Sequence, residues 1–324
     1  MRTMKHLLSL EALSGTEMRE ILNRVPAFKN HRGRHDRPLA GQTWALIFSK
    51  SSTRTRVSFE VGLRELGAEV LFLNAGDIQL GRGEPIRDTA RVLGRMIHGA
   101  VIRTFAQQDV EDFARFSGIP TVNALTDAEH PCQILTDIFT FEEKRGERIE
   151  GKTVTFVGDA ACNVPVSWLW AAARLGFTLR LAAPKAYWPD AAIVKRAAAG
   201  SPVPWDGYCA DQVVERLPIG AGMLELLTDV NLAARQADLL YTDVWVSMGK
   251  EAESAQRLKD LAGYQINGDL VKLAKSNALV MHCLPAYRGK EIDDATVEAH
   301  ADTIFTEAEN RLHTQKSIVN WMVS

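Results

Sequence analysis

Thr43-Trp-Ala-Leu-Ile-Phe48, Arg56-Val-Ser-Phe-Glu-Val-Gly-Leu-Arg-Glu-Leu66 and Glu69-Val-Leu-Phe-Leu73 follow one another with only short connections. The outer two segments are short apolar runs typical of buried strands, whereas the middle one has helical periodicity. Gly67 directly after it is a good helix stop. This strand–helix–strand order predicts a βαβ unit and therefore a parallel sheet.

The same alternation continues in both directions. In the first half it predicts helices at 17–28, 85–96 and 108–117 and strands at 100–104 and 120–123. After a polar stretch at 142–151, a second series predicts strands at 153–157, 178–182, 238–242 and 278–282 and helices at 166–175 and 307–321. The expected fold class is α/β, with two domains joined near residue 145, each a parallel sheet flanked by helices.

Length and charge agree with this picture and exclude several kinds of protein. The 324 residues suit two domains of about 150 residues each. The 38 basic and 40 acidic side chains give a net charge of −2, which argues against non-specific nucleic-acid binding. No apolar run approaches the roughly 20 residues of a membrane span, and Glu11 interrupts the apolar N-terminus, so neither a membrane segment nor a secretory signal is expected.

Four cysteines are scattered along the chain without a Cys-x-x-Cys pair or a metal-ligand spacing: Cys132, Cys162, Cys209 and Cys283. A disulfide framework is not expected in a chain with so large a core. The cysteines therefore predict reduced thiols and a cytoplasmic protein, with no structural metal.

Ser51-Ser52-Thr53-Arg54-Thr55-Arg56 joins the first strand to its helix. Hydroxyls, guanidinium groups and the backbone N–H groups of a helix start suit a multiply charged oxyanion. The alternative is a hydroxyl-rich cap with two solvated arginines. Because arginines at the positive end of a helix are unfavourable without an anion, phosphate binding is the preferred interpretation. The pattern is not a Walker loop, since Gly-x-x-x-x-Gly-Lys is missing.

Further polar residues follow the next predicted strands. They are Gln79, Arg82, Arg103, Asn123 and the segment His130-Pro131-Cys132-Gln133. Ligands of such sheets lie beyond the carboxyl ends of the strands. A neutral imidazole and amide at His130 and Gln133 suit a polarised carbonyl, although a turn histidine and a snorkelling Arg103 explain these residues equally well.

The second half contributes Gly158-Asp159, Asn163, Asp243 before the segment 244–249, His282-Cys283-Leu284-Pro285 and Glu307-Ala-Glu-Asn-Arg311. The Gly-x-Gly-x-x-Gly spacing is missing, so a dinucleotide site is not favoured. Cysteine beside histidine suggests a thiol nucleophile. Adjacent residues of a strand point to opposite faces, however, which places this pair poorly for that role.

Ser52–Arg56, His130–Gln133 and His282–Pro285, in this order and spacing, resemble the motifs of the carbamoyltransferases. Cys283, the segment 243–249 and Ala308-Glu-Asn-Arg311 resemble the branch of that family that uses ornithine, since the aspartate branch has His-Pro-Leu-Pro at the third motif. The resemblance implies transfer of the carbamoyl group of carbamoyl phosphate to the δ-amine of L-ornithine. Citrulline and phosphate would form by direct attack through a tetrahedral intermediate, in a reaction of arginine biosynthesis that needs no cofactor and no metal.

The resemblance also implies an organisation. Residues 1–145, completed by a C-terminal helix at about 307–324 that returns to them, would bind carbamoyl phosphate, and residues 146–306 would bind ornithine. The protein would be a homotrimer with shared active sites, in which the neighbouring subunit lends Gln79.

Site residues are carried over position by position. For carbamoyl phosphate they are Ser52, Thr53, Arg54 and Thr55 on the phosphate, Arg103 and Arg311 between phosphate and carbamoyl oxygen, and His130 and Gln133 on the carbamoyl group. For ornithine they are Asn163, Asp243, Ser247 and Met248 on the α-groups, with Cys283 and the Leu284 carbonyl on the δ-amine. Arg103, His130, Asp243 and Cys283 form the expected catalytic set.

Two positions depart from the family pattern. Cys162 stands where the first of two paired asparagines is usual, and the role of Arg82 stays open. The alternatives are an anion-binding regulatory trimer without turnover and a nicotinamide-dependent dehydrogenase. Putrescine or an acylated ornithine could also replace ornithine, and the residues do not distinguish an anabolic from a catabolic direction.

Overall fold

The computed structural model describes residues 4–74, 76, 83–199, 207, 214–247 and 249–324. The chain divides into two compact units. The first comprises Met1–Phe139 and Glu309–Ser324, and the second comprises Thr140–Ala308. Each unit contains one sheet, so the α/β fold with two parallel sheets is confirmed.

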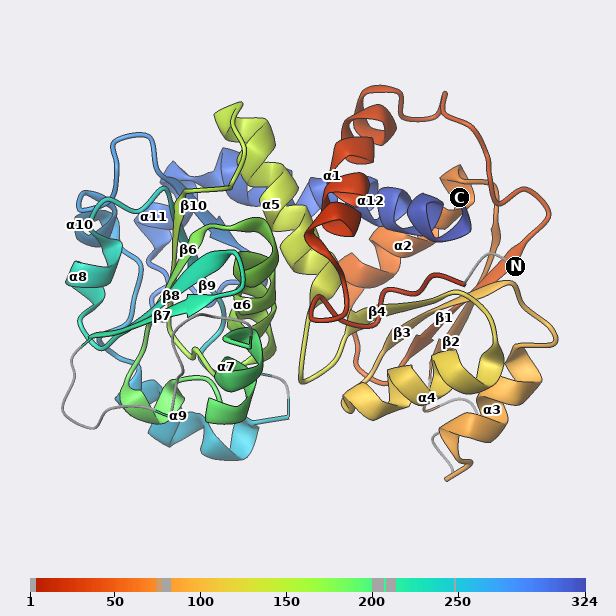
Figure 1. Cartoon of the computed structure of the whole chain (residues 1–324), viewed down its shortest axis with the longest axis horizontal. Coiled ribbons are helices and arrows are strands. Elements are labelled where there is room, and N and C mark those ends of the chain that lie inside the picture. The colour runs from red at the N-terminus through yellow and green to blue at the C-terminus, as the bar shows by residue number, and fades with distance from the viewer. Residues whose placement is uncertain (1–3, 75, 77–82, 200–206, 208–213, 248) are drawn as a thin grey trace. The chain divides into compact units, whose positions relative to one another are not determined.

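The first unit is built on a four-stranded parallel sheet. Its strands, in the order β2-β1-β3-β4, are β2 (Glu69–Asn74), β1 (Thr43–Phe48), β3 (Gly99–Arg103) and β4 (Thr121–Leu125). Helices α3 (Ile86–Leu93) and α4 (Gln107–Ser117) cover one face, with α1 (Gly15–Asn30) and α2 (Thr53–Glu65) on the other (Figure 1). The sheet face that α3 and α4 cover is strongly apolar, because Ala45, Ile47 and Ile102 of the strands pack on Phe113 of α4.

The second unit contains a six-stranded sheet. Its strands, in the order β10-β9-β5-β6-β8-β7, are β10 (Leu279–His282), β9 (Leu239–Thr242), β5 (Thr153–Val157), β6 (Thr178–Ala182), β8 (Gly222–Leu227) and β7 (Val214–Ile219). All pairs are parallel except β7 with β8, a hairpin at one edge that the strand pattern did not predict.

Helices cover both faces of this second sheet. They are α6 (Asn163–Leu175), α7 (Ala191–Ala197), α8 (Val230–Ala234), α9 (Ser254–Asp260), α10 (Gly268–Val271) and α11 (Asp294–Ala299), with 3-10 turns at Lys185–Tyr187 and Glu251–Glu253. Trp168 of α6 packs edge-on against Tyr241 of β9 on one face. On the other, Ala233, Leu270 and Val297 pack over the strands.

Two helices span the division between the units. α5 (Pro131–Arg145) was not predicted, because its start was interpreted as a turn at the end of a strand. α12 (Ala301–Val323) begins six residues before the predicted start at 307. Smaller differences concern helix starts: α2 begins at Thr53 rather than 56, and α6 at Asn163 rather than 166.

Among the described residues, no helix is both long enough and apolar enough to span a membrane.

Candidate active site

The N-terminus of α2 is an electropositive backbone site. Ser52 is the cap residue, and its Oγ accepts a hydrogen bond of 3.3 Å from the Thr55 N–H. The first turn of the helix contains no acidic side chain. The positive end of the helix dipole, the hydroxyls of Ser52 and Thr53 and the half-buried Arg54 therefore favour an anion here.

Two further arginines of the first unit are buried. Arg311, on the part of α12 that belongs to this unit, donates a 2.6 Å hydrogen bond from Nη2 to Thr55 Oγ1. Arg103 ends β3, where it is aligned with Phe48 at the end of β1. Since β1 leads directly into the Ser52 loop, the sheet places Arg103 at the same carboxyl edge as the helix N-terminus.

His130 and Gln133 lie at the start of α5, and both are buried. Burial, followed by the positive charges of Arg311 and Arg103, holds the pKa of His130 well below its ordinary value. The imidazole is therefore neutral at pH 7. The Gln133 side chain donates from Nε2 to Asp137 Oδ1 at 2.8 Å, which fixes the amide plane one turn into α5. Both groups suit hydrogen bonding to a polarised neutral group.

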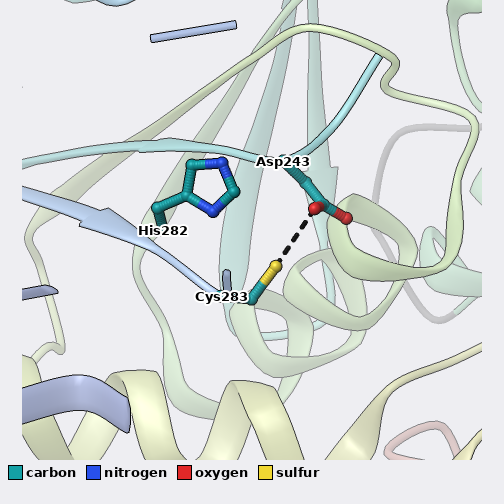
Figure 2. A group of neighbouring side chains, drawn as sticks. All are labelled: Asp243, His282 and Cys283. Carbon is teal, nitrogen blue, oxygen red and sulfur yellow. Dashed lines mark hydrogen bonds between the residues drawn. The ribbon is translucent and has the colours of Figure 1, made fainter. Parts of the chain in front are cut away.

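The second unit brings Asp243 and Cys283 together (Figure 2). Parallel pairing aligns Thr242 of β9 with His282 of β10, so the residues that follow them lie side by side. Cys283 Sγ donates to Asp243 Oδ1 at 3.1 Å, and the Val244 N–H donates to the same oxygen at 2.7 Å. Burial raises the pKa of the Asp243 carboxyl group above its ordinary value.

His282 supports the backbone that follows it. Its Nδ1 accepts a 2.9 Å hydrogen bond from the Leu284 N–H, so we assign the proton to Nε2, which lies 3.2 Å from Glu291 Oε1. Leu284 has a φ of 57°, a left-handed conformation that is rare for a leucine. A buried histidine–carboxylate pair thus holds Leu284 in a strained conformation at the end of β10, which is typical of functional sites.

The cluster of Asp243, His282 and Cys283 suggests two further kinds of chemistry, metal binding and a thiol nucleophile. The ligand atoms of Asp243, His282 and Cys283 all lie within 4.8 Å of one another. Both ring nitrogens of His282 already have partners in Leu284 and Glu291, so a metal would have to break one of these hydrogen bonds. The sulfur is hydrogen-bonded to Asp243 instead of the imidazole (Figure 2), which disfavours a histidine-activated thiol.

The remaining predicted residues are placed as follows. Asn163 is the first residue of α6, and the thiol of the preceding Cys162 has its pKa raised well above the usual range by burial, so it is neutral. Ser247 is half-buried in the segment after Asp243. Gln79, Arg82 and Met248 lie outside the described residues.

Several buried polar residues of these sites were given no role from the sequence, although two of them, Asp159 and Glu307, lie in segments that the sequence singled out. Asp137, Glu291 and Glu307 each contact a predicted residue, and Asp159 forms a 2.6 Å ion pair with Arg257 of α9. Their shared signal is an acidic residue inside an otherwise apolar element or close to a motif. That signal is weak, because a single sequence does not show which acidic residues are buried.

Comparison with known proteins gives a consistent result. Residues 5–143 match the family model for the carbamoyl-P binding domain of aspartate/ornithine carbamoyltransferase, and residues 150–322 match the model for its Asp/Orn binding domain. The chain belongs to the aspartate/ornithine carbamoyltransferase family. The resemblance predicted from the three motifs is thereby confirmed, and the dehydrogenase alternative is excluded.

Individual members of this carbamoyltransferase family are similar over nearly the whole chain. The ornithine carbamoyltransferase of Akkermansia muciniphila is 52% identical over 318 residues, covering 98% of this chain and 97% of the relative. The anabolic ornithine carbamoyltransferase structure from Campylobacter jejuni has a TM-score of 0.88 at 36% identity and covers 98% and 99% of the two chains. That from Pyrococcus furiosus has a TM-score of 0.84 at 41% identity, covering 97% and 96%.

Proposed function

We propose that this carbamoyltransferase transfers the carbamoyl group of carbamoyl phosphate to the δ-amine of L-ornithine, giving L-citrulline and phosphate. The observation that carries the choice of ornithine is the Asp243–Cys283 pair, with its 3.1 Å hydrogen bond. A carboxylate suits the α-ammonium group of an amino acid, and the adjacent thiol can accept from or donate to an amine. The high identity to ornithine carbamoyltransferases supports the same substrate and a place in arginine synthesis.

Carbamoyl phosphate binding is assigned to the first domain, residues 1–145 with the helix at about 307–324. Ser52, Thr53, Arg54 and Thr55 grip the phosphate, Arg103 and Arg311 bridge it to the carbamoyl oxygen, and His130 and Gln133 bind the carbamoyl group. The neutral state of His130 supports this role, because a neutral imidazole can donate one hydrogen bond to a carbonyl oxygen.

Ornithine binding is assigned to residues 146–306. Asn163, Asp243, Ser247 and Met248 bind the α-amino and α-carboxylate groups, and Cys283 with the Leu284 carbonyl orients the δ-amine. The amine must lose its proton before it attacks. With an ordinary pKa near 10.4, this costs roughly 4 kcal/mol at pH 7.5, and burial lowers the cost by disfavouring the ammonium form.

Attack on the carbamoyl carbon converts the carbonyl oxygen into an oxyanion. Donors fixed in advance stabilise such a charge more strongly than water does. Thr55, Arg103 and His130 are buried and are assigned this role. The ammonium group has already lost one proton to solvent before the attack. The tetrahedral intermediate then collapses by breaking the bond from carbon to the phosphate oxygen, and the leaving phosphate accepts a second proton from the attacking nitrogen, so no side chain is needed as a general base.

We further propose a cytoplasmic homotrimer in which Gln79 is supplied by the neighbouring subunit. Val57 of α2 and Leu71 of the edge strand β2 are large apolar side chains that are 54% and 45% exposed. Neighbouring copies that cover this edge would bury them. None of the described cysteines forms a disulfide bond, in keeping with a reducing compartment.

Amine-dependent phosphate release from carbamoyl phosphate, measured with L-ornithine, putrescine, an N-acylated ornithine and L-aspartate, tests the substrate assignment. Putrescine lacks the α-carboxylate, and therefore leaves the partners of that group without hydrogen bonds, which is unfavourable in a buried site. Turnover with ornithine should far exceed that with putrescine or the acylated amine, and aspartate should give none. Equal turnover of putrescine would contradict the assignment of Asn163 to the α-carboxylate.

A further inference from the structure

Glu307 is a buried carboxylate to which no part of the proposed reaction has yet been assigned. It lies in the first part of α12 and is only 1% exposed. Its Oε2 accepts a 3.0 Å hydrogen bond from the backbone N–H of His282, and its Oε1 lies 3.4 Å from the hydroxyl of Tyr241. The glutamate therefore binds the backbone immediately before Cys283 and Leu284.

The position of β10 in the sheet explains why this contact is structurally important. Among the described strands, β10 lies at the edge of its sheet and pairs with β9 alone. The Leu279 N–H points toward β9, where it donates to the Asp238 carbonyl. By the alternation of a strand, the His282 N–H three residues later points away from the sheet. Glu307 takes the place of a further strand there, so α12 fixes the end of β10.

The same helix holds an assigned phosphate ligand one turn later. Arg311, which donates to Thr55 Oγ1, lies four residues after Glu307. Four residues of an α-helix rise about 6 Å and return to nearly the same face. α12 runs without a break from Ala301 to Val323 and contains neither glycine nor proline, so Glu307 and Arg311 belong to one continuous helix.

We propose that Glu307 is a positioning residue that transmits the occupancy of the carbamoyl phosphate site to the ornithine site through one turn of α12. The inference rests on the proposed function, because it takes Arg311 as a carbamoyl phosphate ligand. A ligand that draws Arg311 toward itself moves Glu307 with it, and Glu307 carries the His282 backbone that sets Cys283 and Leu284. Linkage requires the effect to be reciprocal, so ornithine must strengthen carbamoyl phosphate binding by the same factor.

Calorimetric titration of L-norvaline, with and without carbamoyl phosphate, measures this coupling. Norvaline has the ornithine chain without the δ-amine, so it binds without reacting. It reports on Cys283 through the hydrogen bond from Cys283 to Asp243, the residue assigned to the α-ammonium group that norvaline retains. In the unmodified protein, carbamoyl phosphate should tighten norvaline binding by about tenfold or more. In Glu307→Gln, the amide oxygen can still accept from the His282 N–H, but it is a weaker acceptor than a carboxylate oxygen. The coupling should fall to about a third of the original factor or less, while carbamoyl phosphate alone still binds within about twofold of normal.

A second pair of variants tests the helix turn itself and keeps both assigned groups. Glu309 is exposed and lies between Glu307 and Arg311. Glu309→Gly weakens the helix by about 1 kcal/mol relative to Glu309→Ala, and both lose the same 3.6 Å contact with His313. The glycine variant should lose coupling and the alanine variant should keep it. This comparison decides the matter if Glu307→Gln does not fold.

The outcomes separate the two proposals. An unmodified protein that binds no carbamoyl phosphate or forms no citrulline contradicts the proposed function. A coupled, active protein whose coupling factor is unchanged in both Glu307→Gln and Glu309→Gly overturns the role of Glu307 and leaves the proposed function intact. An unmodified, active protein that shows no coupling likewise overturns the role of Glu307.

Discussion

Asp243 is an aspartate whose charge is unfavourable until a cation binds. Burial raises its pKa in the folded protein above the value expected for an unfolded chain. Folding therefore disfavours the ionised form, and the resulting loss of stability is present above the folded pKa and absent below the unfolded one. An α-ammonium group at this position would offset the loss.

Asp243→Asn should separate stability from substrate use. The amide oxygen can still accept from Cys283 and Val244, and the buried charge is removed, so the melting temperature at pH 7 should stay level or rise. The KM for ornithine should rise about 10- to 100-fold, since a hydrogen bond to a charged group contributes about 1.5–3 kcal/mol. Thermal unfolding and citrulline kinetics measure the two effects.

The matched control is Asp269→Asn, at an aspartate that is 92% exposed in α10. It should change neither quantity. As the pH is lowered, the unmodified protein should also lose ornithine affinity. Because the pKa of Asp243 is raised, this loss should occur at a higher pH than for an ordinary aspartate, whose pKa is about 3.9. A variant that binds ornithine normally, or that is much less stable at pH 7, would show that Asp243 has another role.

Thr55 is a second residue whose contribution can be isolated. Its hydroxyl accepts the 2.6 Å hydrogen bond from Arg311, and both side chains are buried. Thr55→Val keeps the shape and leaves a buried guanidinium N–H without this acceptor, a loss of about 1–3 kcal/mol. Carbamoyl phosphate affinity, measured by calorimetry, should fall about 5- to 100-fold. Thr55→Ser should restore most of it, and an equal loss in both variants would refute the argument.

At the level of elements, α9 is attached to the end of β5 by buried charges. Asp159 follows β5, and Arg257 of α9 donates to its Oδ2 at 2.6 Å. The same Nη1 lies 3.4 Å from the Trp245 carbonyl, within the segment that follows Asp243. The ion pair therefore holds α9 and the assigned ornithine-binding segment against the second sheet.

A double-mutant cycle on this pair should show strong coupling. Arg257→Met or Asp159→Asn alone leaves a buried partner unsatisfied, which for a buried ion pair destabilises by about 3–5 kcal/mol. The double variant should be less destabilised than the sum of the two by at least about 1 kcal/mol. Urea unfolding measures the free energies. Strict additivity would mean that the two side chains do not depend on each other.

The elements also show where prediction from sequence succeeds and fails. The apolar strands at 43–48, 153–157 and 178–182 were predicted with their observed bounds, because buried parallel strands are continuous apolar runs. α5 was missed because a proline that starts a helix looks locally like a turn. The β7–β8 hairpin was missed because Arg216 and Glu225 pair with each other on it, and their charges obscure the strand pattern.

Prediction of the candidate site from the sequence succeeded for some residues and failed for others. Motif residues at strand ends, such as Asp243 and Cys283, were predictable because parallel strands bring their carboxyl ends together. The supporting roles of Glu291 and Glu307 were not predictable. Each becomes important only through burial beside a backbone N–H, and that burial is set by packing distant in sequence.

At the level of the whole molecule, the proposed trimer makes activity depend on more than one chain. In a closed ring each subunit meets its neighbour through the same heterologous contact. If a site combines Asp243 of one subunit with Gln79 of its neighbour, two variants that are each inactive alone can complement one another in a mixed trimer. If each subunit contained a complete active site, mixing the two variants would restore no activity.

Mixing Gln79→Ala with Asp243→Asn subunits, after dissociation and reassembly, tests this dependence. A site is intact when its Asp243 comes from a Gln79→Ala subunit and its Gln79 comes from a neighbouring Asp243→Asn subunit. Random assembly makes about a quarter of sites of this kind, so citrulline formation should recover to about that fraction. The matched control mixes Asp243→Asn with Cys283→Ala: both changes fall in the share that one chain gives its own site, so every site stays defective. Recovery in the control, or none in the test mixture, would refute the shared site.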